Sequence, residues 1–151
     1  MPTFLTRNFT LEELTATNTG LPNTPSKGSI AYSKILAMAR LLQYVRDVCG
    51  FPIYVNSCYR SPRVNSKVGG ARTSFHLYGQ AVDISTYHYD DAMKQTLENS
   101  LRFYKPCEFI KYDTFWHVAF DISTLGTGEL PVSTWDKDYP ELAEEKQVED
   151  L

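Results

Sequence analysis

Residues 74–83 read SFHLYGQAVD, and the pair Trp116-His117 follows further along the chain. Two imidazoles, His76 and His117, and one carboxylate, Asp83, are the ligand set that catalytic zinc uses when a fourth position stays open for water. A close pair of ligands plus one distant ligand predicts a metal site divided between separate parts of the chain. This pattern favours a hydrolase.

The segment around Asp83 alternates as a strand does. In residues 81–85, AVDIS, the apolar neighbours of Asp83 share one face, so its carboxylate projects from the other face. Gly79 suits a turn that brings the His76 ring back toward this strand, because glycine adopts backbone angles closed to other residues. We therefore expect both side chains at one place.

A hairpin is expected next, with strands at residues 109–112 and 115–120 around Asp113 and Thr114. In the second strand, FWHVAF, His117 lies on the face opposite its apolar neighbours. One contact between this strand and the strand of residues 81–85 would complete the metal site.

Helices should cover the sheet. A capping-box pattern at residues 10–13 predicts a short helix, and apolar residues at helical spacing predict a long one over 29–49. Residues 52–59 favour a strand that ends at Arg60, and residues 89–104 a second amphipathic helix. These elements indicate an α+β fold with a small antiparallel sheet flanked by helices.

Composition sets the wider limits. The chain has 151 residues, 42% of them hydrophobic, which is enough for one domain with a real core. No apolar run approaches the length of a membrane span, and the N-terminus lacks the apolar stretch of a secretory signal. We expect no membrane insertion, and synthesis in the cytoplasm. The cysteines, Cys49, Cys58 and Cys107, show no C-x-x-C spacing, so buried thiols are expected rather than disulfides or a thiolate zinc site.

Charge is unevenly distributed. Residues 133–151 hold seven acids and two lysines, which predicts an acidic extension after a domain of residues 1–132. A nucleic-acid partner is not expected, because the net charge is -3 and no binding motif appears. A basic stretch precedes the metal motif and either attracts an anionic substrate or serves as a solvated loop. Its residues are Arg60, Arg63, Lys67 and Arg72.

Three pieces of sequence carry a family resemblance: the S-x-H-x-x-G-x-A-x-D segment, residues 56–61 (NSCYRS) and the W-H pair. They resemble the zinc D-alanyl-D-alanine peptidases, a family of carboxypeptidases, dipeptidases and phage murein endopeptidases that shares its fold with the Hedgehog signalling domain. The resemblance covers roughly residues 5 to 122. It implies one Zn²⁺ held by His76, Asp83 and His117, and cleavage of peptidoglycan stem peptides.

The general base is the point of departure from the family. The family usually has an acidic residue three positions before the final histidine, where this chain has Thr114. Asp113 would face the same way as His117 if the strand were continuous, whereas a turn at Asp113 would spoil that geometry. Glu108 is the second candidate, and a third possibility is that neither serves.

Arg60 matches the arginine of the family's Y-R-S segment. There it resembles a clamp for a substrate carboxylate or a polariser of the scissile carbonyl, since its planar fork suits bidentate capture. The alternative is a structural arginine that bridges the loop to a core acid.

Two classes of function follow. The first is a zinc peptidase acting on stem peptides, as a D-Ala-D-Ala carboxypeptidase or a phage-type murein endopeptidase. The second is a zinc-stabilised binding module of the same fold without a base, which Thr114 favours. We expect a monomer, either a cytoplasmic dipeptidase or a protein that a phage lysis system releases to the cell wall.

Overall fold

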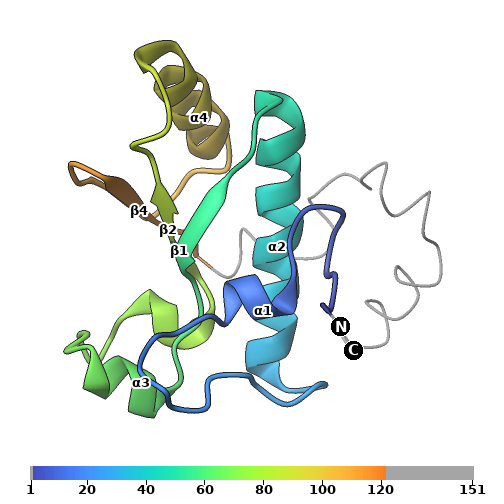
Figure 1. Cartoon of the computed structure of the whole chain (residues 1–151), viewed down its shortest axis with the longest axis vertical. Coiled ribbons are helices and arrows are strands. Elements are labelled where there is room, and N and C mark those ends of the chain that lie inside the picture. The colour runs from blue at the N-terminus through green and yellow to red at the C-terminus, as the bar shows by residue number, and fades with distance from the viewer. Residues whose placement is uncertain (1, 122–151) are drawn as a thin grey trace.

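One antiparallel sheet of four short strands forms the framework, in the order β1-β2-β4-β3. The computed structural model describes residues 2–121 (Figure 1). The strands are β1 (Tyr54–Ser57), β2 (Ala81–Ser85), β3 (Glu108–Lys111) and β4 (Phe115–Ala119). The central strands pair along their full length, from Ala81 opposite Ala119 to Ser85 opposite Phe115.

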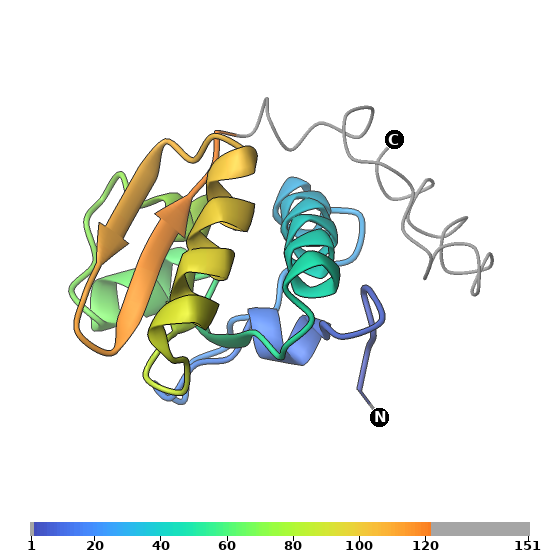
Figure 2. The same cartoon turned by 90° about the horizontal axis from the view of Figure 1, so that it is seen from above.

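Two long helices, α2 (Ile30–Cys49) and α4 (Asp91–Phe103), cover one face of this sheet (Figures 1 and 2). Each begins at a side-chain cap, Ser29 for α2 and Asp90 for α4, which accepts a hydrogen bond from a backbone N–H of the first turn. Helix α2 ends at Gly50, whose φ of 75° is the left-handed conformation that glycine allows.

Strand alternation gives the sheet an apolar face and a polar face. The apolar face packs into the main core with α2 and α4. Its central residues are Val82, Ile84, Trp116 and Val118, and the helices add Ile35, Leu42, Leu97 and Leu101. Full burial of such a side chain contributes on the order of 1.5–3 kcal/mol, so this face determines which way the intervening residues of β2 and β4 must point.

Shorter elements lie on the other side of the sheet, where the polar face is (Figure 2). They are α3 (Pro62–Lys67) and the single 3-10 turn η1 (Phe75–Tyr78), while α1 (Leu11–Leu14) packs near β1. The sequence interpretation did not include α3. Its start carries a local signal, since the Ser61 hydroxyl accepts from the N–H of Val64 and a proline follows the cap.

The predicted α+β fold, a small antiparallel sheet flanked by helices, is confirmed. Both long helices and strands β1, β2 and β4 form within the expected segments, and residues 81–85 match β2. Strand β3 begins and ends one residue earlier than the expected 109–112, because Glu108 belongs to it. The predicted acidic extension, residues 133–151, lies outside the described residues. No helix in the described part of the chain is both long and apolar enough to cross a membrane.

The three cysteines are free, as expected, but only one is a buried thiol. Cys58 is fully buried, Cys49 is partly exposed and Cys107 is exposed. The expectation of buried thiols was wrong for Cys107, because it lies just before the edge strand β3 and not on the apolar face.

Candidate metal centre

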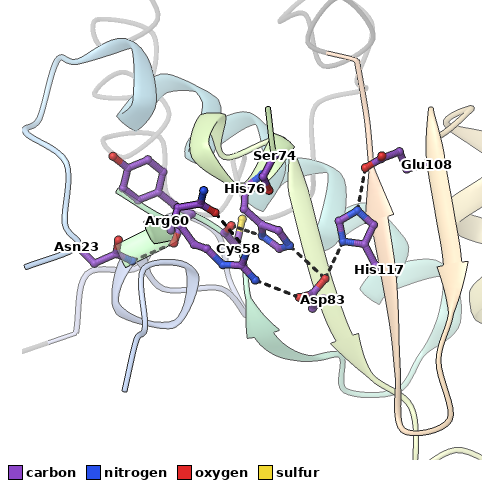
Figure 3. Close-up of polar contacts among 10 residues, drawn as sticks. Asn23, Cys58, Arg60, Ser74, His76, Asp83, Glu108 and His117 are labelled. Carbon is purple, nitrogen blue, oxygen red and sulfur yellow. Dashed lines mark hydrogen bonds and ion pairs between the residues drawn. The ribbon is translucent and has the colours of Figure 1, made fainter. Parts of the chain in front are cut away.

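Three side chains meet on the polar face of the sheet. β2 and β4 pair so that Asp83 lies directly opposite His117. His76 comes from η1, which packs on β2, and its ring points to the same place (Figure 3). The cross-strand contact predicted from the sequence therefore forms.

One oxygen of Asp83 lies between the two imidazoles. Its Oδ1 is 2.9 Å from Nδ1 of His117 and 3.2 Å from Nε2 of His76. One potential ligand atom from each residue lies within 4.8 Å of the others. His76 and Asp83 are buried, at 2% and 9% exposure, so a carboxylate charge there needs compensation.

A backbone carbonyl sets the tautomer of His76. Its Nδ1 is 2.6 Å from the carbonyl oxygen of Cys58, and since a carbonyl only accepts, Nδ1 must be the donor. In a neutral ring Nε2 then carries a lone pair and faces Asp83 Oδ1, which is another acceptor. Two acceptors at 3.2 Å require positive charge between them, from a proton or from a metal cation.

The backbone around His76 is held from both sides. The Ser74 hydroxyl accepts from the His76 N–H at 3.2 Å, and the His76 carbonyl accepts from the Arg60 N–H at 2.9 Å. Gly79 ends η1 with a φ of 68°, and a Cβ there would lie 3.1 Å from the side chain of Ile35. The turn expected at Gly79 is confirmed, and it allows close packing against α2.

The charges of the cluster reinforce one another. Burial raises the pKa of the Asp83 carboxyl, but hydrogen bonds from His117 and His76 outweigh it and leave the pKa at about 2. The hydrogen bond to Asp83 raises the pKa of His117; burial opposes this, and the hydrogen bond to Glu108 adds to the increase. Asp83 is therefore an anion at neutral pH, and its surroundings favour cations.

These residues fit a zinc ion. Two imidazoles and one carboxylate, with one histidine oriented by a backbone carbonyl, are a usual donor set for catalytic zinc. The nearby Cys58 thiol does not belong to this set, because burial raises its pKa to about 12 and it stays protonated.

Glu108 lies beside the cluster and Asp113 does not. Strand β3 places Glu108 on the same face as His117, and its Oε1 is 2.9 Å from His117 Nε2 (Figure 3). Asp113 lies in the exposed bend between β3 and β4, because β4 begins only at Phe115. The continuous strand that would have directed Asp113 toward the candidate metal site is therefore absent. Of the two candidate general bases, Glu108 is the one that contacts the cluster.

Arg60 reaches the cluster from the segment after β1. Its Nη2 is 3.8 Å from Asp83 Oδ2, and its Nη1 is 3.5 Å from the side-chain oxygen of Asn65. A Cβ on Gly70 would lie 2.1 Å from that oxygen and 3.1 Å from Arg60 Nη1, so only glycine fits there. Arg60 thus contacts the buried acid Asp83 and also lines the open hollow. Both roles expected from the sequence, a structural arginine and a clamp for substrate, are consistent with this position.

Asn23 is a supporting residue that the sequence interpretation missed. Its buried amide donates to the carbonyls of Thr15 and Tyr59 at 2.8 and 2.9 Å, and its oxygen accepts from the Ser61 N–H at 2.7 Å. It therefore holds the backbone on both sides of Arg60. Asn23 stands in a stretch rich in turn residues, where an asparagine is an ordinary turn former, so no local signal pointed to this role.

A hollow of about 420 Å³ opens over the cluster. His76, Asp83 and His117 form its floor, with Arg60 and Glu108 at its sides. Ile110, Tyr112 and Phe115 add an apolar wall from the β3–β4 hairpin. The hollow gives a ligand access to all of the charged groups at once.

The fold and this geometry define a protein with a candidate metal site of two histidines and one carboxylate on the polar face of an antiparallel sheet. A family model for peptidase M15 matches residues 7–119, and the chain therefore belongs to the peptidase M15 family. It is also similar to the zinc D-Ala-D-Ala carboxypeptidase of Streptomyces albus G, with 38% identity over 78 residues. That match covers 51% of this chain and 31% of the relative.

The family resemblance expected from the sequence is confirmed by this match. The expected Zn²⁺ cofactor is supported by the zinc enzyme among the relatives and by the His76, Asp83 and His117 group. The chain spans about a third of the length of that relative, so similarity alone does not assign the relative's activity to it.

Proposed function

We propose that this chain is a zinc-dependent peptidase that hydrolyses peptide bonds in bacterial cell-wall stem peptides, as a D-Ala-D-Ala carboxypeptidase or a murein endopeptidase. The observation that carries the proposal is the Glu108 carboxylate, 2.9 Å from His117 Nε2 and beside the three candidate ligands. A metal site used only for stability needs no such acid at its open side.

His76, Asp83 and His117 are the residues that would hold the metal. The chemistry that a bound zinc ion would supply there is Lewis-acid polarisation of a peptide carbonyl and a lower pKa for a water molecule. Glu108 is the residue that can accept a proton from the attacking water and return it to the leaving amine. Its side chain is 41% exposed, so it can reach a substrate in the hollow.

Arg60 supplies the positive charge on the opposite side of the hollow. Its side chain is 19% exposed, and its contact with Asp83 is long, at 3.8 Å, which leaves donors for a substrate carboxylate or an oxyanion. Glu108 and Arg60 therefore lie on two sides of the place where a scissile bond would bind.

A matched pair of acid-to-amide variants tests the proposal. We expect Glu108→Gln to retain zinc and fold but to cleave purified muropeptides about a hundredfold more slowly or worse, the scale for losing a general base. Asp113→Asn, in the exposed bend, should cleave at nearly the wild-type rate. Release of new amine and zinc content are measured on the same preparations.

The reverse ranking of these two variants would transfer the role of base to Asp113. If the zinc-loaded wild-type protein binds muropeptides and releases no amine from any of them, the chain is a binding module and the peptidase proposal fails. Monomeric state and release to the cell wall by a phage lysis system stay predictions.

A further inference from the structure

A second hollow, of about 450 Å³, opens on the other side of Arg60. The loop after α1, the end of β1 and helix α3 form its walls. Its lining residues are Ala16, Thr17, Asn18, Asn56, Ser57, Arg60, Val64 and Val68. We propose that this hollow is a second substrate subsite, which binds uncharged, amide-bearing residues of the same stem peptide next to those at the metal centre.

The two hollows are neighbours along one row of the sheet. Ser57, Asp83, His117 and Ile110 are paired directly opposite one another across β1, β2, β4 and β3. The last three line the hollow over the metal centre, and Ser57 lines the second one. Arg60 lines both, so an extended peptide that crosses the strands passes from one hollow to the other beside its guanidinium.

The chemistry of the second hollow suits peptide groups. Asn18 and Asn56 each offer amide donors and an acceptor, and Ser57 offers a hydroxyl. Within residues 2–121, none of these three side chains has a hydrogen-bond partner, so their polar atoms are available to a ligand. Buried Val64 and the more exposed Val68 supply an apolar wall for small aliphatic side chains such as methyl groups.

The charge of the lining narrows the ligand further. Among the described lining residues there is no carboxylate and no lysine, and the single cation, Arg60, is shared with Asp83. A cationic group placed there would lose hydration without gaining a close partner, whereas neutral peptide groups exchange water for the asparagine amides. The hollow therefore favours the uncharged part of an extended peptide over a cationic group.

This inference rests on the proposed peptidase activity and adds that substrate length matters. Two synthetic probes test it: N-acetyl-D-Ala-D-Ala and an N-acetylated stem pentapeptide ending in D-Ala-D-Ala. We expect wild-type kcat/KM to be higher for the pentapeptide. In an Asn18→Ala, Asn56→Ala double variant, the pentapeptide-to-dipeptide ratio should fall about tenfold, the scale for losing two neutral hydrogen bonds. Ala16→Trp, which fills the hollow from an exposed position, should lower the ratio as well.

Asn99→Ala is the matched control, since Asn99 is an exposed asparagine on α4, the helix on the apolar side of the sheet. Its ratio should equal that of the wild type. An unchanged ratio in both subsite variants would overturn the inference. If the wild type cleaves neither probe, its action as a D-Ala-D-Ala carboxypeptidase fails, and calorimetric affinity for the pentapeptide decides the subsite: a tenfold loss in the double variant supports it, and equal affinity refutes it.

Discussion

His76 and His117 are the same residue type in two different electrostatic settings. His76 has one nitrogen committed to the Cys58 carbonyl, so its other nitrogen is left to face Asp83. His117 lies between two carboxylates, with Asp83 at Nδ1 and Glu108 at Nε2, and its pKa is raised in consequence. The His76 ring is therefore oriented as a candidate metal ligand, while the His117 ring links the candidate ligands to the candidate base.

Arg60 is expected to depend on its planar shape as well as its charge. Arg60→Lys keeps the charge but cannot contact both Asp83 and Asn65 or capture a carboxylate with two donors. We expect normal zinc content and loss of most turnover, measured as kcat/KM on muropeptides. Wild-type kinetics would assign Arg60 to structure instead.

Asn23 is expected to contribute to stability through groups that it satisfies inside the protein. Asn23→Ala leaves the Thr15 and Tyr59 carbonyls and the Ser61 N–H without their partner. An unsatisfied buried group costs about 1–3 kcal/mol, so the free energy of unfolding in urea should fall by at least that much.

Asn23→Asp is the informative companion variant. It keeps the acceptor for Ser61 but loses the donors to both carbonyls, so it too should unfold at lower urea. If both variants were as stable as the wild type, the amide would not hold the backbone around Arg60.

The hairpin of β3 and β4 shows how one element decides which acid is near the metal centre. Both strands are short, and the chain bends between Lys111 and Phe115, so Asp113 belongs to the bend. Glu108 stands at the far end of β3, where antiparallel pairing brings it back beside His117. Separation in sequence is thus a poor guide to which acid contacts His117. Asp113 is closer to His117 in the sequence, but Glu108 is the acid that contacts it.

The segment between α3 and η1 is expected to tolerate no side chain at Gly70. In Gly70→Ala the new Cβ would lie 2.1 Å from the buried Asn65 side-chain oxygen, and the neighbouring Arg60 would have to move with it. Overpacking of this kind costs about 1–3 kcal/mol. We expect a lower urea midpoint and weaker muropeptide turnover.

Gly69→Ala offers a comparison in the same loop. A Cβ on Gly69 meets no atom within 4 Å, so the cost comes only from its φ of 73°. Turnover per folded molecule should then stay near the wild-type value, whereas equal loss of turnover in both variants would contradict the role of Gly70 in placing Arg60.

At the scale of the whole molecule, one thin sheet separates a dry core from a charged site. The apolar face packs on α2 and α4, and the polar face carries Asp83 and His117. The turn η1 packs on β2, and α3 contacts η1 on this side of the sheet (Figure 2). Alternation along each strand couples the two faces. When one residue of β2 packs into the core, the next residue must point toward the polar face and the site. Stability and site geometry therefore depend on the same strands.

Metal removal is expected to lower the melting temperature of the whole domain. A ligand present at about 100 times its Kd stabilises the folded state by about 2.7 kcal/mol, which corresponds to several degrees for a domain of this size. Chelation of the zinc-loaded protein should reverse that gain. His76→Ala should bind little zinc and show no shift on chelation, and an equal shift in wild type and variant would contradict zinc binding at this cluster.

The sequence by itself determined the two long helices, the strands of the sheet and the candidate ligand set. Apolar periodicity predicted α2 and α4, and alternation predicted that Asp83 and His117 point away from the core, because burial of their neighbours leaves only the other face. The spacing of the motif in residues 74–83 indicated His76 as the third candidate ligand. These features are local, so a short stretch of chain contains the information that specifies them.

Only the tertiary structure decided which acid lies beside the cluster and which residues hold the surrounding backbone in place. The position of Glu108 depends on the register of β3 against β4, the hydrogen bonds of Asn23 join segments 36 and 38 residues apart, and Arg60 separates two hollows that no local pattern reveals. Such contacts form between residues that are distant in the chain, and their geometry follows from how the helices, the sheet and the loops pack together.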